Sequence, residues 1–151
     1  MEFISFDDSL TDEFRQMNLT WVQKYFEVEP ADEVVLSDPR KNIIDKGGYI
    51  FFGKRGADIT CTFALLKITD SEFELSKMAV KEAFLGQNMG NEMLTFCLDQ
   101  AKKLGIKKLV LYSNTKLGPA IHLYRKFGFS ESPLNGSIYK RADIKMELDI
   151  K

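Results

Sequence analysis

The sequence has little cysteine and histidine and lacks any motif that combines them. Cys61 and Cys97 lie in separate apolar segments, and His122 is the only histidine. One histidine cannot build a histidine-rich metal site, and the two cysteines do not form a Cys-x-x-Cys pair. The sequence therefore predicts a reduced protein without a metal, and we expect it in the cytoplasm.

The sequence also lacks an excess of charge of either sign and any long apolar run. The chain has 21 lysines and arginines against 22 aspartates and glutamates, for a formal net charge of −1. Without a basic excess, there is no overall field to attract nucleic acid or an anionic membrane. No apolar run approaches the roughly 18 residues of a membrane span, and the acidic start MEFISFDDSL does not resemble a signal peptide. We therefore expect neither nucleic acid nor a membrane as a partner.

Length and composition fit one globular domain. The 151 residues are 44% hydrophobic and 28% charged, which is ordinary for a domain with one substantial core. No internal repeat, linker or low-complexity segment divides the chain. We expect a single domain over residues 1–151.

Hydrophobic periodicity predicts alternating strands and helices. Strands are expected at 1–6, 49–54, 58–68, 73–80, 107–113, 129–132 and 144–149, and helices at about 10–26, 88–104 and 119–127, with two short helices, or a helix and a loop, at 29–46. A helix of about 17 residues separates 73–80 from 107–113, so these two strands should run parallel through a right-handed crossover. The prediction is an α/β (α+β) fold with a mixed, mostly antiparallel sheet of about six or seven strands and about four flanking helices.

The most informative stretch of the chain is 73–104. Its apolar alternation shifts by one position at 76–77, which predicts a β-bulge. The helix that follows starts between Gly86 and Gly90, where several backbone N–H groups have no intrahelical partner. A helix start of this kind is a place for a phosphate. The alternative is a tight turn in which Gly90 allows close packing.

Three segments resemble the GNAT superfamily of N-acetyltransferases. ELSKMAV at 74–80 resembles its bulged fourth strand, LGQNMG at 85–90 its acetyl-CoA pyrophosphate loop, and LYSNTKLGPAIHLYRKFGF at 111–129 its fifth strand, asparagine loop and next helix. The order of the predicted elements matches over nearly the whole chain. The resemblance implies the GNAT fold, in which the fourth strand is splayed from the fifth to admit acetyl-CoA.

The resemblance also implies which residues bind acetyl-CoA as co-substrate. The strand backbone would bind the pantetheine arm, the loop backbone would hold the pyrophosphate, and an asparagine would bond the pantetheine. The implied residues are Met78, Ala79, Val80, Gly86, Gln87, Asn88, Met89, Gly90, Asn91, Asn114 and Tyr124. Leu85 and Asn88 depart from the family pattern, although asparagine tolerates a left-handed backbone. Asn114 also suits a turn in which its side chain bonds its own backbone.

For catalysis, the resemblance implies Tyr124 as the general acid that protonates the departing thiolate. The alternative for Tyr124 is a core aromatic. Glu74 would accept the ammonium proton through a water, with Glu72 or water alone as alternatives. No metal is required.

The implied activity is acetyl transfer from acetyl-CoA to a primary amine of a small molecule or peptide, by direct attack in a ternary complex. A non-catalytic acyl-CoA-binding or regulatory module of the same fold is the alternative, and a homodimer is left open. Residues 21–46 and 131–143, which would select the acceptor, carry no recognised motif. Asp32, Glu33, Asp38 and Asp45 could favour a cationic amine, but we interpret them as solvated helix charge.

Overall fold

The computed structural model describes residues 1–135 and 139–151. Its elements in order are β1 (Glu2–Ser5), a 3₁₀ turn (Asp8–Leu10), α1 (Thr11–Tyr25), α2 (Pro30–Ser37), a π-helical turn (Arg40–Ile44), β2 (Tyr49–Arg55), β3 (Asp58–Lys67), β4 (Glu72–Val80), a 3₁₀ turn (Glu82–Phe84), α3 (Met89–Lys103), β5 (Lys108–Ser113), α4 (Gly118–Lys126), β6 (Ser130–Ser132) and β7 (Ile144–Asp149). The predicted strands and long helices are therefore present, and two short helical segments occupy the stretch 29–46.

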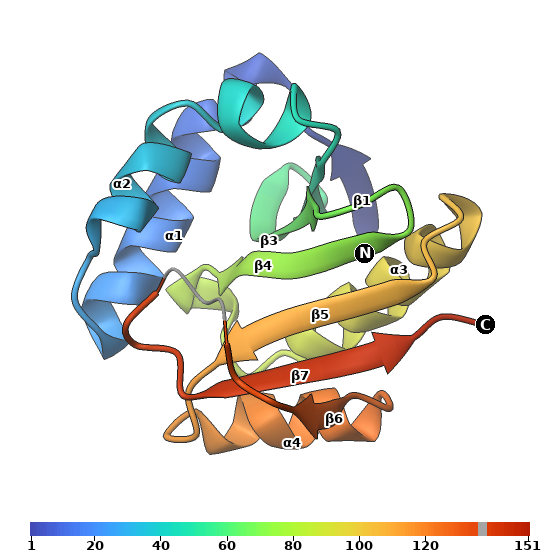
Figure 1. The fold of residues 1–151 in the computed structure, drawn as a ribbon. Coiled ribbons are helices and arrows are strands. Elements are labelled where there is room, and N and C mark those ends of the chain that lie inside the picture. The colour runs from blue at the N-terminus through green and yellow to red at the C-terminus, as the bar shows by residue number, and fades with distance from the viewer. Residues whose placement is uncertain (136–138) are drawn as a thin grey trace.

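Within the described residues, seven strands form one sheet in the order β1-β2-β3-β4-β5-β7-β6. β4 and β5 are parallel, and the other neighbouring pairs are antiparallel. α3 is the crossover between β4 and β5, as its position in the chain requires (Figure 1). The predicted mixed, mostly antiparallel sheet is confirmed.

β4 contains the predicted bulge. Thr62 of β3 lies opposite Ala79, but Ala64 lies opposite Ser76, so β4 has one extra residue between these pairs. Lys77 takes up the extra length with a φ of 55°, a left-handed conformation that costs free energy for a residue with a side chain. The bulge turns the second half of β4 away from the regular ladder.

The splay between β4 and β5 follows the bulge. Within the described residues, the parallel ladder of these strands pairs 72–74 with 108–110, whereas β4 stays paired with β3 as far as Val80. β4 at 75–80 therefore has one edge paired with β3 and an opposite edge that has no ladder to β5. The central strands part at this point, as predicted.

Helices cover both faces of the sheet (Figure 1). α3 and α4 pack on one face around Phe51, and α1 and α2 pack on the other around Phe52. These adjacent phenylalanines point to opposite faces because side chains alternate along a strand. The splay therefore opens between two helical layers. None of the helices in the described part of the chain has the length and apolar character needed to cross a membrane.

Candidate functional site

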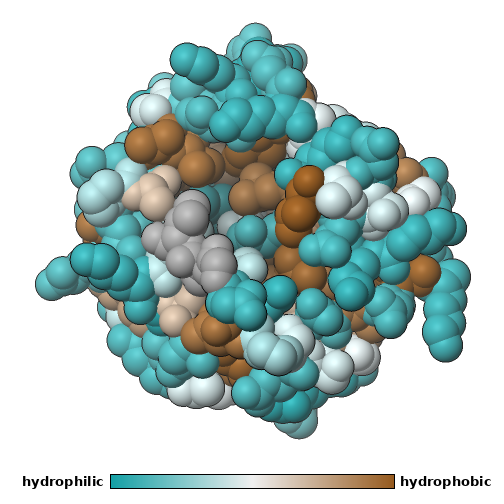
Figure 2. Space-filling model, in the orientation of Figure 1, coloured by the Kyte–Doolittle hydropathy of each residue, from teal (hydrophilic) through white to brown (hydrophobic). Residues whose placement is uncertain are grey.

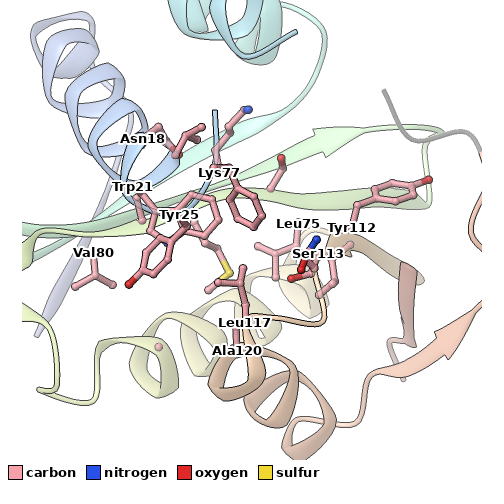
Figure 3. Close-up of a pocket in the computed structure, with 18 of the residues that line it drawn as sticks. Asn18, Trp21, Tyr25, Leu75, Lys77, Val80, Tyr112, Ser113, Leu117 and Ala120 are labelled. Carbon is pink, nitrogen blue, oxygen red and sulfur yellow. The ribbon is translucent and has the colours of Figure 1, made fainter. Parts of the chain in front are cut away.

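A cavity of about 260 Å³ lies where β4 and β5 separate. Its walls come from the second half of α1, from β4 at 74–80, from the end of β5, from α4 and from residues 139–142. Trp21 and Tyr25 enter it from α1, opposite Leu117 and Ala120 (Figure 3). On the face of the molecule shown in Figure 2, hydrophobic side chains gather inside a rim of hydrophilic ones. An apolar hollow with a few polar groups is typical of a small-molecule site.

The open edge of β4 forms one wall of this cavity. Met78, Ala79 and Val80 all line it. Backbone groups on a strand edge must find hydrogen-bond partners, and an extended chain of amides supplies them. The geometry thus suits the role that the family resemblance implies for these three residues.

The loop before α3 presents a helix start to the same region. Gly86 has a φ of 76° and Asn88 a φ of 67°. Asn88 thus adopts the left-handed backbone conformation although it is not a glycine. Within the described residues, no side chain caps α3, which leaves N–H groups of its first turn for a ligand. A hollow beside the cavity is lined by Gly86, Asn88, Met89, Gly90, Asn91 and Lys126. Lys126 donates to the Asn91 side chain at 2.8 Å and adds positive charge near the helix start.

Gln87 and Gly90 serve the protein's own packing in this loop. The Gln87 side-chain oxygen accepts from Arg55 at 2.6 Å, and its nitrogen donates to the Ala83 carbonyl at 3.3 Å. A Cβ added to Gly90 would lie 2.7 Å from Leu123 Cδ2. Gly90 therefore lets α3 approach α4 closely, which supports the packing explanation for this glycine.

Tyr124 reaches the cavity from α4. Its hydroxyl lies 3.7 Å from the Met78 sulfur, on the wall formed by β4. Burial, with a smaller contribution from Cys97, raises the pKa of Tyr124 to about 12, so the phenol keeps its proton at neutral pH. Its ring also packs edge-on against Phe129, with 6.0 Å between centroids. Tyr124 is thus a packed aromatic whose protonated hydroxyl lies at the cavity wall, and its role as general acid stays a prediction.

The structure separates the two carboxylates that are candidates for the base. Glu74 lines the cavity, whereas Glu72 is not part of the wall that the described residues form. Burial raises the pKa of Glu74, and the charge of Lys77 and a hydrogen bond with Ser76 offset this only in part. A carboxylate of raised pKa is a better proton acceptor near neutral pH than an exposed one.

Asn114 also lines the cavity, with its amide bonded to the protein itself. Its side-chain nitrogen donates to the Arg141 carbonyl at 2.7 Å, and its oxygen accepts from the Lys116 N–H at 2.9 Å. The second bond closes a turn in which the Asn114 side chain binds nearby backbone, which is the alternative role that its residue type predicts. Asn114 therefore fixes the loop after β5, and its bond to pantetheine stays a prediction.

The sequence did not reveal a buried charged cluster beside the cavity. Asp32 is fully buried and accepts from Lys77 at 3.0 Å and from both Arg141 guanidinium nitrogens at 2.7 Å. Lys77 also donates to the Tyr139 hydroxyl at 2.7 Å. Its side chain points away from Leu117 and Ala120 (Figure 3). The interpretation of Asp32 as solvated helix charge is therefore wrong.

The sequence carried a local signal for the start of α2, but none for the burial of Asp32. Glu29 and Asp32 flank Pro30 at the start of α2 and form a reciprocal capping box, a pattern of acid, proline and acid that marks a helix start. The burial of Asp32 itself depends on Arg141, 109 positions later. No periodicity in the sequence predicts that contact.

Known proteins share both the sequence pattern and this fold. The acetyltransferase (GNAT) domain family matches residues 43–131. The N-acetyltransferase YvbK of Bacillus subtilis, itself uncharacterized, is 26% identical over 116 residues, 75% of each chain. The ribosomal protein bS18-alanine N-acetyltransferase of Escherichia coli K12 is 28% identical over 81 residues, 54% of this chain and 55% of that one.

Solved structures resemble the whole chain. A GNAT acetyltransferase from Staphylococcus aureus Mu50 superposes with a TM-score of 0.86 at 18% identity over 99% of both chains. The spermidine N-acetyltransferase of Vibrio cholerae, in complex with CoA and spermine, has a TM-score of 0.76 at 18% identity, covering 99% of this chain and 95% of that one. At these identities the structures show a common fold. With the family match over 43–131, this protein belongs to the GNAT family of acetyltransferases.

Proposed function

We propose that this protein transfers the acetyl group of acetyl-CoA to a primary amine. The main support for this proposal is the cavity, which brings together the open edge of β4, the uncapped start of α3 and the Tyr124 hydroxyl. Each of these features suits a different part of acetyl-CoA. An extended amide chain fits the strand edge, a pyrophosphate fits the helix start, and a thioester fits between Met78 and Tyr124.

In the proposed reaction the amine attacks the thioester carbonyl carbon in a ternary complex. The C–N bond forms, the C–S bond breaks, and the thiolate takes the Tyr124 hydroxyl proton. The second proton that the acylated nitrogen loses returns to the Tyr124 phenolate. Glu74 accepts the proton of the incoming ammonium through a water. The edge of β4 positions the thioester, and such positioning supplies much of the rate in direct transfers. No acyl-enzyme is formed.

A non-catalytic acyl-CoA-binding module is the second candidate. It is favoured by Leu85, which is 45% exposed at the cavity where the family pattern has arginine or glutamine. A module that only binds acyl-CoA has no use for a proton donor at the sulfur position, so Tyr124 favours the enzyme.

A thiol-release assay separates the two functions. Acetyl-CoA is incubated with the protein and a panel of amines, polyamines, amino acids and peptides, and free CoA thiol is followed with a chromogenic disulfide. Catalysis predicts release that depends on one class of amine. Tight acetyl-CoA binding without amine-dependent release across the panel would establish the binding module instead.

The pantetheine arm should contribute most of the selectivity for the co-substrate. We expect CoA and acetyl-CoA to bind more tightly than ADP, because ADP fills the helix start but leaves the edge of β4 without hydrogen-bond partners. Isothermal titration calorimetry with the three ligands measures this difference. Equal affinity for ADP and acetyl-CoA would remove the strand edge from the proposed binding mode.

Replacing Gly90 with valine should weaken acetyl-CoA binding far more than replacing Gln87 with alanine. The valine side chain would collide with Leu123 and block the first turn of α3. Gln87, in contrast, would bind the pyrophosphate mainly through its main chain. Calorimetry with acetyl-CoA compares the two variants. Equal losses would show that side chains hold the pyrophosphate.

A double variant identifies which effect of the valine matters. Adding Leu123→Ala to Gly90→Val removes the atom that a new Cβ would meet at 2.7 Å. Recovery of binding in the double variant would assign the loss to packing between α3 and α4. Continued loss would assign it to a blocked pyrophosphate.

A further inference from the structure

The bulge in β4 changes which side chains of this strand share a face of the sheet. Before the bulge, Glu74 lies opposite Leu66 of β3, which packs against the core beneath α1 and α2. Cross-strand partners share a face, so Glu74 points toward α1 and α2. Side chains reverse direction at each residue of a regular strand. Three such steps from Glu74 would send Lys77 to the opposite face, beneath α3 and α4.

The bulge instead brings Lys77 to the face of Glu74. The Lys77 ammonium donates to the carboxylate of Asp32 in α2 at 3.0 Å and to the Tyr139 hydroxyl at 2.7 Å. The side chain points away from Ala120 of α4 (Figure 3). Glu74 and Lys77 both line the cavity. The extra residue in β4 therefore places a carboxylate and a cation on the same wall.

A lysine at the bulge carries two separate costs. Position 77 has a φ of 55°, which glycine adopts freely and a residue with a side chain adopts at a cost in free energy. The Lys77 side chain is also only 4% exposed, and burial of a cation is unfavourable unless the cation is paired. A glycine would avoid both costs. A function of the ammonium would account for a lysine at this position.

Other ionisable groups that face the cavity place little charge near Glu74. Lys24 of α1 lies 3.7 Å from Glu82, so these two charges offset each other. In the sheet, Glu74 lies beside the apolar residues Leu66 and Val110. A phenol is neutral near pH 7. The tyrosines on the wall are Tyr25 of α1, Tyr112 of β5, Tyr124 of α4 and Tyr139.

The buried cluster supplies the charge that acts on Glu74. Arg141 is shared between Glu29 and Asp32. Burial lowers the pKa of Lys77, and the charge and hydrogen bond of Asp32 offset this effect. Burial raises the pKa of Glu74, and the charge of Lys77 opposes that rise. A cation near a buried carboxylate favours its ionised form, and only the ionised form can accept a proton.

We propose that Lys77 is a positioning residue for the base, because its ammonium, placed by the bulge on the face of Glu74, keeps that carboxylate ionised. The inference rests on the proposed function. Asp32 holds the ammonium in place, and Lys77 acts through Glu74 without taking part in bond formation. Without the ammonium, Glu74 would stay protonated to higher pH, and transfer would begin at higher pH.

The titration of Glu74 tests this role without turnover. The protein is labelled with carbon-13 at the glutamate side-chain carboxyls, and NMR follows their resonances against pH, with Glu74→Gln to assign the signal. In Lys77→Met the midpoint of Glu74 should move to higher pH by about one pH unit or more. In Lys77→Arg, which keeps the charge, it should stay near the native value. An unchanged midpoint in Lys77→Met would overturn the inference.

Lys81→Met is the matched control for Lys77→Met. Lys81 directly follows β4, lies 3.0 Å from Glu13 and is 35% exposed at the side chain. It is not part of the cavity wall that the described residues form, so its loss should not move the midpoint of Glu74. An equal rise in both variants would assign the effect to overall charge and overturn the inference. If methionine prevents folding, Lys77→Gln repeats the test with a neutral polar side chain.

The pH dependence of thiol release separates the two levels of the proposal. The acidic limb of kcat/KM should move to higher pH in Lys77→Met by as much as the midpoint of Glu74, and should return in Lys77→Arg. A purely structural role would lower the rate without moving this limb, and that result would overturn the inference. If the midpoint moves as expected but the native protein releases no thiol with any amine, the proposed function fails and the coupling of Lys77 to Glu74 stands. If the native protein releases thiol and the midpoint does not move, the inference fails and the proposed function stands.

Discussion

Tyr124→Phe should lower kcat by about 10²-fold or more while acetyl-CoA affinity stays within a few-fold, because loss of a general acid has roughly this effect. The substitution removes one oxygen and keeps the ring, so the packing against Phe129 is retained. The half-buried phenol, with its pKa raised to about 12, holds a proton beside the position proposed for the sulfur. Steady-state kinetics with the best amine should place the loss in kcat rather than KM.

Tyr49→Phe is the matched control for Tyr124→Phe. Tyr49 lies on β2, where its ring stacks on Phe51, and it is not part of the cavity wall formed by the described residues. The same loss of a hydroxyl there should leave kcat unchanged. If Tyr124→Phe acetylates its best amine at nearly the native rate, the thiolate receives its proton from water and Tyr124 is a packing residue.

Asp32→Ala should destabilise the fold by about 3–5 kcal/mol, the usual cost of removing one partner from a buried ion pair. Lys77 is 4% exposed and Arg141 is 16% exposed at the side chain, so the loss of Asp32 leaves two largely buried cations without their main carboxylate. For a domain of this size the melting temperature should fall by roughly 6–20 °C. Thermal denaturation followed by circular dichroism measures the fall.

Glu33→Ala is the control for this loss of stability. Glu33 is the next residue on α2 and is exposed, so its removal should change the melting temperature little. A fall in Asp32→Ala no larger than in Glu33→Ala would show that the buried cluster contributes no net stability.

The same carboxylate should contribute to the pH dependence of stability. Burial by itself raises the pKa of Asp32, but hydrogen bonds from Arg141 and the Glu29 N–H, with the charge of Lys77, outweigh it and lower the pKa from 3.8 to about 2. A group whose pKa is lower in the folded state stabilises the fold above its unfolded pKa and loses that contribution as the pH falls. The native protein should lose this contribution of Asp32 to the free energy of unfolding between about pH 4 and pH 2. Urea denaturation at these pH values should show no such loss for Asp32→Asn.

The sequence by itself determined the features that depend on near neighbours. The shift of apolar residues at 76–77 predicted the bulge because side-chain direction alternates strictly along a strand. The long helices followed from a period of 3.6 residues, and the asparagine at 88 is a residue type that tolerates the left-handed backbone found there. The motifs within 74–129 then predicted the GNAT family, which the family match confirms.

Only the tertiary structure decided the features that join distant parts of the chain. Asp32 is buried because Lys77, 45 positions later, and Arg141, 109 positions later, reach it. Glu74 and Glu72 occupy the same face of one strand, and only the splay between β4 and β5 distinguishes them. Periodicity predicts whether a side chain points inward, but not which residues distant in the sequence contact it. The partners of a buried charge are therefore decided when the layers of the fold pack together.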